Sequence, residues 1–250
     1  MTVLLKEKRK MVCINSPPVT DEWVSYTAYL SRLLGSSVAY LDIHAPSAED
    51  WTDISAEVVG LKPALTVWQE PVLTWVQRPF RRWIVRRMIN RLPGSVLLVQ
   101  QPHWPLHRLL LVVRADGHDE PAVVWTERLA AQSGAAVTIL PIVPSLPGLY
   151  QHGTRVQPPL EVLLSPATFS GAYLQAYARR LGKLGIEGSI CQRVGAADWQ
   201  IRSEMAQDDY DLVLIAEEST SRAVRWLLGE LVTPLLGWLK RPLLLARPAV

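Results

Sequence analysis

Histidine and cysteine are the residue types in this chain that could hold a metal, or supply a nucleophile and its base. The five histidines lie at positions 44, 103, 107, 118 and 152, and the two cysteines at 13 and 191. Only His103 and His107 have a spacing that could suit a metal, and prolines lie beside them, so we expect exposed linker histidines. Cys13 and Cys191 lie in apolar runs and are expected to be buried, reduced thiols. The sequence has no G-x-S-x-G, P-loop or G-x-G-x-x-G motif, so we expect neither an enzyme nor a metal site.

Arginines gather in segment 76–92, which the spacing of apolar residues predicts to be a helix. The arginines at 78, 81, 82, 86, 87 and 91 surround an apolar stripe at 76, 80, 84, 88 and 92. We interpret them as a solvated face whose charges pair with acids such as those of 49–57. The alternative is a surface that binds an anion, a nucleic acid or lipid headgroups. The net charge of the chain is only +3, which makes nucleic acid the less favoured partner.

Composition and hydropathy indicate a globular protein without a membrane span. The 250 residues are 49% hydrophobic and 20% charged, enough for one large domain or two ordinary ones. The N-terminal apolar stretch is too short for a signal peptide, and charged residues interrupt the most apolar segment, 223–248. Because there is also no disulfide pattern, we predict a cytoplasmic protein.

The elements that must position a site occur twice in the sequence. Residues 64–102 and 210–248 both predict a strand, then an amphipathic helix, then a second strand. We therefore predict two α/β domains in tandem, 1–104 and 105–250, joined by a proline-containing linker at 101–105.

Strands that alternate with helices predict a parallel sheet in each unit, with helices on both faces. Strands are expected at 10–15, 37–43, 64–69 and 95–100, and then at 108–113, 135–142, 186–193, 211–216 and 242–247. Helices are expected at 21–34, 48–58, 76–92, 119–132, 167–182, 198–207 and 222–238, with a long loop at 144–161. The first unit therefore lacks one strand–helix pair that the second unit has.

A spaced pattern of small residues follows the predicted strand 211–216. Ala216 and Ser219 are followed, after nine residues, by Gly229 and Glu230. The spacing is that of the motif G-x2-G-x9-G-S/T. By this spacing and by the order of its elements, the chain resembles a tandem universal stress protein over essentially its whole length. The resemblance implies two flavodoxin-like or Rossmann-like units of the adenine nucleotide alpha hydrolase-like kind, with strand order 3-2-1-4-5. It also implies a ligand site at the carboxyl ends of the strands, where the strand order reverses.

The cofactor that this resemblance implies is ATP or another adenine nucleotide, held by the second unit. Arg114, Ala115 and Asp116 would form one wall of the pocket, and Val143 would lie near the base. The other implied cofactor-binding residues would lie near the phosphates: Ala216, Ser219, Arg222, Gly229 and Glu230. Ala216 and Ser219 stand where the motif has glycines, and Glu230 replaces its hydroxyl residue, so we predict a degenerate pocket.

The two predicted outer strands, 95–100 and 242–247, are equivalent apolar edges that we expect to pair within one chain as a pseudo-dimer. Pairing should begin after Pro242, which has no amide donor. The function we predict is that of a non-enzymatic stress-response or regulatory protein that binds an unidentified protein partner, with a homodimer as an alternative assembly. A scaffold without a ligand, or an anion-binding surface on 76–92, are the other hypotheses.

Overall fold

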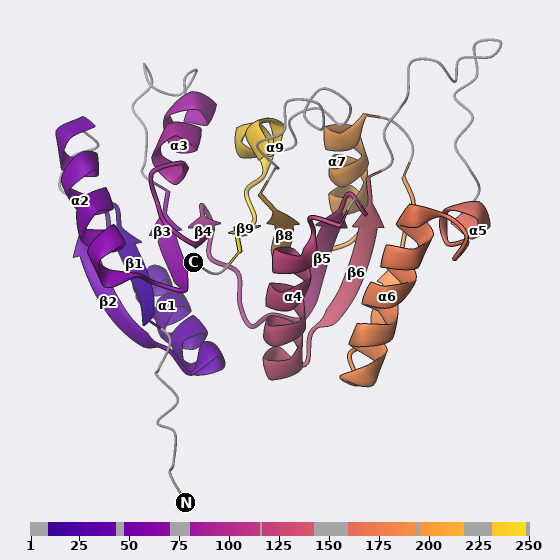
Figure 1. The fold of residues 1–250 in the computed structure, drawn as a ribbon. Coiled ribbons are helices and arrows are strands. Elements are labelled where there is room, and N and C mark those ends of the chain that lie inside the picture. Colours follow the sequence, from indigo (N-terminus) through magenta and orange to yellow (C-terminus); the bar gives the residue numbers. More distant parts are fainter. Residues whose placement is uncertain are drawn as a thin grey trace, which may run out of the picture.

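The strands and helices of the computed structural model form one sheet with helices on both of its faces (Figure 1). The structure describes residues 10–43, 48–70, 81–115, 117–142, 160–193, 196–217 and 232–248. Within these ranges all nine strands belong to the same sheet. No helix among them is long and apolar enough to cross a membrane.

The first half of the chain supplies four of these strands. Its described elements are β1 (Lys10–Asn15), α1 (Asp21–Leu34), β2 (Ser37–Asp42), α2 (Ala48–Leu61), β3 (Leu65–Gln69), α3 (Arg81–Ile89) and β4 (Ser95–Val99). Helix α1 begins where the Thr20 side chain accepts a hydrogen bond from the Trp23 N–H, and it ends at Gly35. Gly35 has the left-handed φ of 59° that such a helix end requires and that glycine adopts without strain.

The second half supplies the remaining five strands. Its described elements are β5 (Arg108–Val113), α4 (Glu120–Ser133), β6 (Ala136–Pro141), α5 (Leu160–Leu163), α6 (Phe169–Lys183), β7 (Gly188–Ile190), α7 (Ala197–Gln207), β8 (Leu212–Ala216), α9 (Val232–Trp238) and β9 (Leu243–Ala246). The predicted order of elements is confirmed, although β7 is shorter than the predicted strand 186–193. The predicted helices 76–92 and 222–238, and the loop 144–161, lie partly outside the described residues.

The strand order confirms the predicted topology. The sheet runs β2-β1-β3-β4-β9-β8-β5-β6-β7. The second half alone has the order β7-β6-β5-β8-β9, which is the predicted 3-2-1-4-5, and the first half has the same order without its outermost strand. Neighbouring strands are parallel except β4 and β9, which pair antiparallel and join the halves. The edges pair within the chain as predicted, while the division into domains 1–104 and 105–250 stays a prediction.

A local two-fold axis passes through the β4–β9 junction. Two equivalent hydrogen bonds, each just beyond a five-residue strand, align the halves: Glu70 N to Val99 O, and Glu217 N to Ala246 O. Together with the strand registers, they place residues 65–70 and 95–100 opposite 212–217 and 242–247 at one constant offset in residue number. In the antiparallel pair, Leu97 lies across from Leu244, its own equivalent under that offset. Each residue near the axis therefore has a counterpart in the other half.

An apolar core fills the space between the sheet and each layer of helices. Helices α1, α4 and α6 supply the core on one face, and α2, α3, α7 and α9 supply the core on the other. Both cores continue from the first half into the second. Helices α3 and α9 contact each other beside the two-fold axis (Figure 1). The halves thus share one sheet and two cores.

Candidate functional site

The turn after β5 positions two of the predicted site residues, Arg114 and Ala115. The buried carboxylate of Asp119 accepts hydrogen bonds from the Arg114 N–H at 3.1 Å and from the Ala115 N–H at 2.7 Å. Ala115 has a φ of 52°, a left-handed value that is uncommon outside glycine. Because Asp119 bonds both amides, it holds this turn in place and makes no side-chain bond to the start of α4.

The Arg114 side chain crosses from β5 to β8, where the strand order reverses. Its side chain is 3% exposed, and Nη2 donates to the carbonyl oxygens of Ala216 and Glu217, each at 3.3 Å. Nε lies 4.0 Å from Asp119 Oδ1. Arg114, Ala115 and Ala216 thus lie together, and the Arg114 side chain bridges the ends of β5 and β8. The crevice that resemblance assigned to a nucleotide contains this arginine.

The equivalent crevice of the first half is bridged by Gln69. Its Oε1 accepts from the Ser16 N–H at 3.4 Å, and its Nε2 donates to the Pro18 carbonyl oxygen at 3.2 Å. Gln69 ends β3, and Ser16 follows β1, so this side chain links the two strands at their carboxyl ends. No pattern in the sequence marks Gln69 as a site residue.

The two bridges lie at equivalent positions but run in opposite directions. By sheet register, Gln69 corresponds to Ala216 and Ser16 to Arg114. In the first half the long side chain is that of Gln69, at the end of β3. In the second half it is that of Arg114, which follows β5. Each crevice is therefore crossed by a long polar side chain of its own half.

A polar network occupies the carboxyl ends of β1 and β2. Asn15 Oδ1 accepts from the Trp23 indole N–H at 2.6 Å, and Asn15 Nδ2 donates to Asp42 Oδ1 at 2.8 Å. Trp23 is fully buried and Asn15 is almost so. Because these buried polar groups are hydrogen-bonded to one another, they stabilise the fold at the end of β1.

Arg247, which sequence analysis did not select, makes the densest set of contacts at the strand ends. Its Nε and Nη2 donate to the Glu217 carboxylate at 2.5 and 2.8 Å. The remaining N–H groups bond the carbonyl oxygens of Ile89 at 3.1 Å, Gly94 at 3.2 Å and Leu92. All five guanidinium donors are therefore used. Arg247 follows β9 and joins the end of β8 to the end of α3 in the other half.

Six predicted cofactor-binding residues lie outside the described residues. They are Asp116, Val143, Ser219, Arg222, Gly229 and Glu230. Next to Asp116, Gly117 has a φ of 87°, and a Cβ there would lie 2.8 Å from the Tyr173 hydroxyl. Tyr173 of α6 therefore packs closely over the turn after β5, which keeps that position to glycine.

Among the described thiols and histidines, both thiols are kept protonated and His103 lies beside an acid. Burial raises the pKa of the Cys13 thiol to about 12, and burial is also the main cause that raises the pKa of the Cys191 thiol to about 12. These pKa values disfavour the nucleophilic thiolate. No three His, Cys, Asp or Glu side chains of the described part gather as a metal site. His103 is less exposed than expected, because its Nδ1 lies 2.5 Å from the buried Asp211 Oδ1.

Comparisons with known proteins bear on the fold. No protein-family model matches the chain, and no curated protein matches it either. Among solved structures, the chain is similar to a universal stress protein from Archaeoglobus fulgidus DSM 4304, with a TM-score of 0.58 and 8% identity over 96% of this chain and 86% of that one. It is also similar to a protein of unknown function from Pseudomonas aeruginosa PAO1, with a TM-score of 0.56 and 15% identity over 97% and 83%. The fold is thus that of universal stress proteins along nearly the whole chain.

Proposed function

We propose that this chain is a non-enzymatic regulatory protein of the universal stress protein type, which acts in the cytoplasm by binding a protein partner. Its second half would carry a degenerate adenine-nucleotide pocket at the carboxyl ends of β5 and β8. The observation that carries the proposal is the Arg114 side chain, which bonds Ala216 and Glu217 across that crevice. A nucleotide would have to displace this buried side chain, so we expect its affinity to be low.

The chemistry of the described residues supports a binding role over a catalytic one. The Cys13 and Cys191 thiols have raised pKa values, and Asp119 is engaged by backbone amides. General acid–base or covalent catalysis needs groups with pKa values near the working pH and within reach of a substrate. Arg114 remains as a cation, suited to an anionic group if the crevice opens.

A thermal-shift titration with ATP, ADP and AMP, with and without magnesium, tests the pocket. We expect no saturable rise in melting temperature below about 1 mM nucleotide, the range of weak binding. A saturable rise at micromolar nucleotide would overturn the degenerate pocket, provided that Gly229→Trp abolishes it. Gly182→Trp is the matched control, because a side chain added at Gly182 meets open space.

Partner binding needs its own measurement. The full chain, immobilised through its N-terminus, would be exposed to a cell extract with and without about 5 mM ATP, a level above the about 1 mM threshold. We expect specific capture that does not depend on nucleotide. Capture that requires ATP would instead mean that the crevice works as a nucleotide switch.

A further inference from the structure

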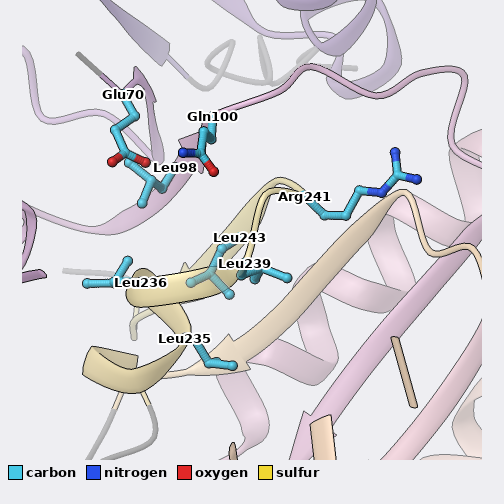
Figure 2. A pocket seen from close by; sticks show the side chains of 8 residues that line it. All are labelled: Glu70, Leu98, Gln100, Leu235, Leu236, Leu239, Arg241 and Leu243. Carbon is cyan, nitrogen blue, oxygen red and sulfur yellow. The ribbon is translucent and has the colours of Figure 1, made fainter. Parts of the chain in front are cut away.

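The pocket at the ends of β3 and β4 is too small for a ligand from outside the chain. Figure 2 shows the leucines from β4, α9 and β9 that line it, with Glu70 and Gln100 on one wall and Arg241 on the other. The space between them holds about one water molecule. This pocket therefore offers no site for a partner.

The outer edge of β2 differs from the equivalent place in the second half, where one more strand is present. Within the described residues β2 pairs with β1 alone, and Figure 1 shows it as the last strand on its side of the sheet. Its counterpart β6 pairs with β5 and also with β7. The second half therefore shows how a further strand is bound at this position.

Two residues of β6 hold β7 through their backbone. The Val137 N–H donates to the Glu187 carbonyl oxygen at 2.9 Å, and the Ile139 carbonyl oxygen accepts from the Cys191 N–H at 3.0 Å. By strand register, Val38 of β2 corresponds to Val137 and Tyr40 of β2 to Ile139.

The backbone of β2 is oriented to bond a strand in the same way. The Ile43 N–H donates to the Asn15 carbonyl oxygen, just beyond the pair of β2 with β1. In a parallel pair, alternate residues of a strand bond the same neighbour. Val38, Tyr40 and Asp42 therefore direct their N–H and carbonyl groups away from β1.

Strand β2 also lacks the features that usually protect the edge of a sheet. It is six residues long, with the sequence SVAYLD, so it has no proline or lysine and one charge at its last position. The opposite edge strand, β7, is only three residues long. A long edge without such features is a ready template for pairing with another chain.

The side of α1 that lies over this edge is uncharged. The Thr27 and Tyr40 hydroxyls are 3.2 Å apart, and the Ser31 hydroxyl donates to the Ser36 carbonyl oxygen at 2.9 Å, just before β2. Val24 lies one turn before Thr27 and two turns before Ser31, so it shares their side of the helix. Val24 and Tyr40 are 50% and 49% exposed, which leaves apolar surface beside the open edge.

Exposed charges of opposite sign lie at the two ends of this edge. Asp21 and Glu22 begin α1 and Asp42 ends β2, whereas Arg32 is in the last turn of α1 and Lys10 begins β1. Because α1 connects two parallel strands, it runs opposite to them, so the acids lie at the carboxyl end of β2 and the bases at its amino end. A second copy related by a two-fold axis would bring its basic end beside the acidic end of the first.

We infer that β2 pairs antiparallel with β2 of a second copy of this chain. The register centred on Tyr40 uses all three outward-directed residues, since Tyr40 then lies opposite its own equivalent and Val38 opposite Asp42. On the other face of the strands, Ala39 lies opposite Leu41. The edge is remote from the β5–β8 crevice in the sheet order, so the inference does not depend on the proposed function.

The mass of the full chain in solution tests this pairing. Light scattering after size-exclusion chromatography would follow samples from about 1 to 100 µM, which spans dissociation constants in the micromolar range. One chain has a mass of 28.0 kDa. We expect the measured mass to rise toward twice this value as the concentration increases.

A proline at the centre of the pair should weaken it. Tyr40→Pro removes an N–H that points away from β1, so no bond to β1 is lost, and edge strands tolerate proline at such positions. We expect the dissociation constant to rise about tenfold or more, because two equivalent central donors are lost. Gly188→Pro is the matched control, since the bonds on either side of Gly188 direct its own N–H away from β6; it should leave the dimer unchanged.

The charges at the ends of the edge allow a second variant. Arg32→Glu places acids at both ends, so the dissociation constant should rise about threefold or more, and the difference should shrink in high salt. Arg179→Glu is the control, because both arginines are exposed and both donate Nε to a carbonyl oxygen of their own helix. Arg179 is on α6, away from β2, and its substitution should have no effect on the dimer.

A disulfide reports the register directly. Cα atoms of a hydrogen-bonded antiparallel pair are about 5.5 Å apart, which is within the range that a disulfide spans. Tyr40→Cys should therefore form a covalent dimer under mild oxidation by oxidised glutathione, seen on a non-reducing gel. Val124→Cys is the control, since Val124 is 44% exposed on α4 but lies away from the edge, and it should not cross-link.

Three results would each overturn the inference. They are the mass of one chain at every concentration, an unchanged dimer in Tyr40→Pro, and no more cross-linking through position 40 than through position 124. A dimer that forms only after removal of residues 1–9 would also overturn it, because that segment would then be what covers β2.

Should Tyr40→Pro fail to fold, the mass of the unaltered chain and the cross-link decide. A nucleotide-induced thermal shift has no bearing on these outcomes, so failure here and failure of the proposed function can be told apart.

Discussion

At the scale of single residues, Arg247 joins the two halves through three hydrogen bonds to carbonyl oxygens of the first half. Its side chain is 12% exposed, and it bonds Glu217 as well as the end of α3. Removing it leaves a partly buried carboxylate and three carbonyl oxygens without these donors, and such groups are costly to leave unsatisfied. The contribution of Arg247 therefore lies in the contact between halves.

We predict that Arg247→Ala lowers the free energy of unfolding by about 2–4 kcal/mol, measured by urea denaturation. Arg247→Lys should recover little of this loss, because an ammonium cannot reproduce the planar fork. The control is Arg241→Ala, which breaks an ion pair to the largely exposed Asp209 and should cost less than about 1 kcal/mol. Equal losses for both arginines would contradict the prediction.

Cys13 gives the protein a pH dependence that can be measured. The thiol is fully buried, and burial raises its pKa from 9.0 to about 12. Between these pH values the unfolded chain has lost the thiol proton and the folded chain has kept it, so rising pH favours unfolding. We predict that the free energy of unfolding falls by up to about 1.4 kcal/mol per pH unit above pH 9 on account of this group.

Urea denaturation at pH 8, 9 and 10 measures that slope, and Cys13→Ala should make it shallower. The absolute stability of the variant is not the readout, because the smaller side chain also leaves space in the core. A slope that is the same with and without the thiol would mean that Cys13 ionises normally in the folded chain.

At the scale of elements, Ser95 ties α4 to both strands of the β4–β9 junction. Its hydroxyl accepts from the Trp125 indole N–H at 2.9 Å and from the Arg247 N–H at 3.1 Å. Trp125 belongs to α4, Ser95 opens β4, and Arg247 follows β9. The register of the antiparallel pair is thereby fixed by a side chain as well as by the backbone.

We expect Ser95→Ala to destabilise the protein by about 1–3 kcal/mol, because two buried N–H donors lose their acceptor. Thermal denaturation checks this, with Ser189→Ala as the control. Ser189 lies on an exposed part of β7, and its hydroxyl contacts that of Thr138 on β6. Loss of the Ser189 hydroxyl should therefore cost less than about 0.5 kcal/mol. A neutral Ser95→Ala would show that water replaces the hydroxyl.

The elements could be predicted from the sequence far better than the contacts at the strand ends. Local signals such as Thr20 and Gly35 fix where α1 begins and ends, and continuous apolar runs mark the central strands. The strand β7 was predicted too long: it lies at the edge of the sheet and pairs only with β6, over Gly188–Ile190. The bridges of Gln69 and Arg114 join residues far apart in the chain, and no periodic pattern announces such bonds.

The same limit explains why the candidate site was only partly predicted. The resemblance placed Arg114, Ala115 and Ala216 around one nucleotide pocket; the structure places them at the ends of β5 and β8, and their binding of a nucleotide stays a prediction. It could not show that Arg114 bonds carbonyl oxygens there, because that depends on side-chain direction. Arg247 makes its side-chain hydrogen bonds to residues at least 30 positions away, and the sequence does not display such partners.

At the scale of the whole molecule, the β4–β9 pair should hold the halves together even when the chain is cut. We predict that segments 1–104 and 105–250, produced together, co-purify as a one-to-one complex, because each would otherwise expose an apolar strand edge. Size-exclusion chromatography with light scattering measures this. Leu244→Pro in the second segment should separate them, since proline removes a ladder hydrogen bond. Halves that stay apart, monomeric and stable would contradict the interface.

The two-fold axis between Leu97 and Leu244 has one more consequence. In an assembly of two identical chains, every substitution beside such an axis occurs on both sides, and a change that suits one side is imposed on the other. Here the sides are separate positions of a single chain, and they already differ: Arg247 corresponds to Gln100, and Ser95 corresponds to Pro242. A substitution on one side can therefore be selected without the same substitution being imposed on the other.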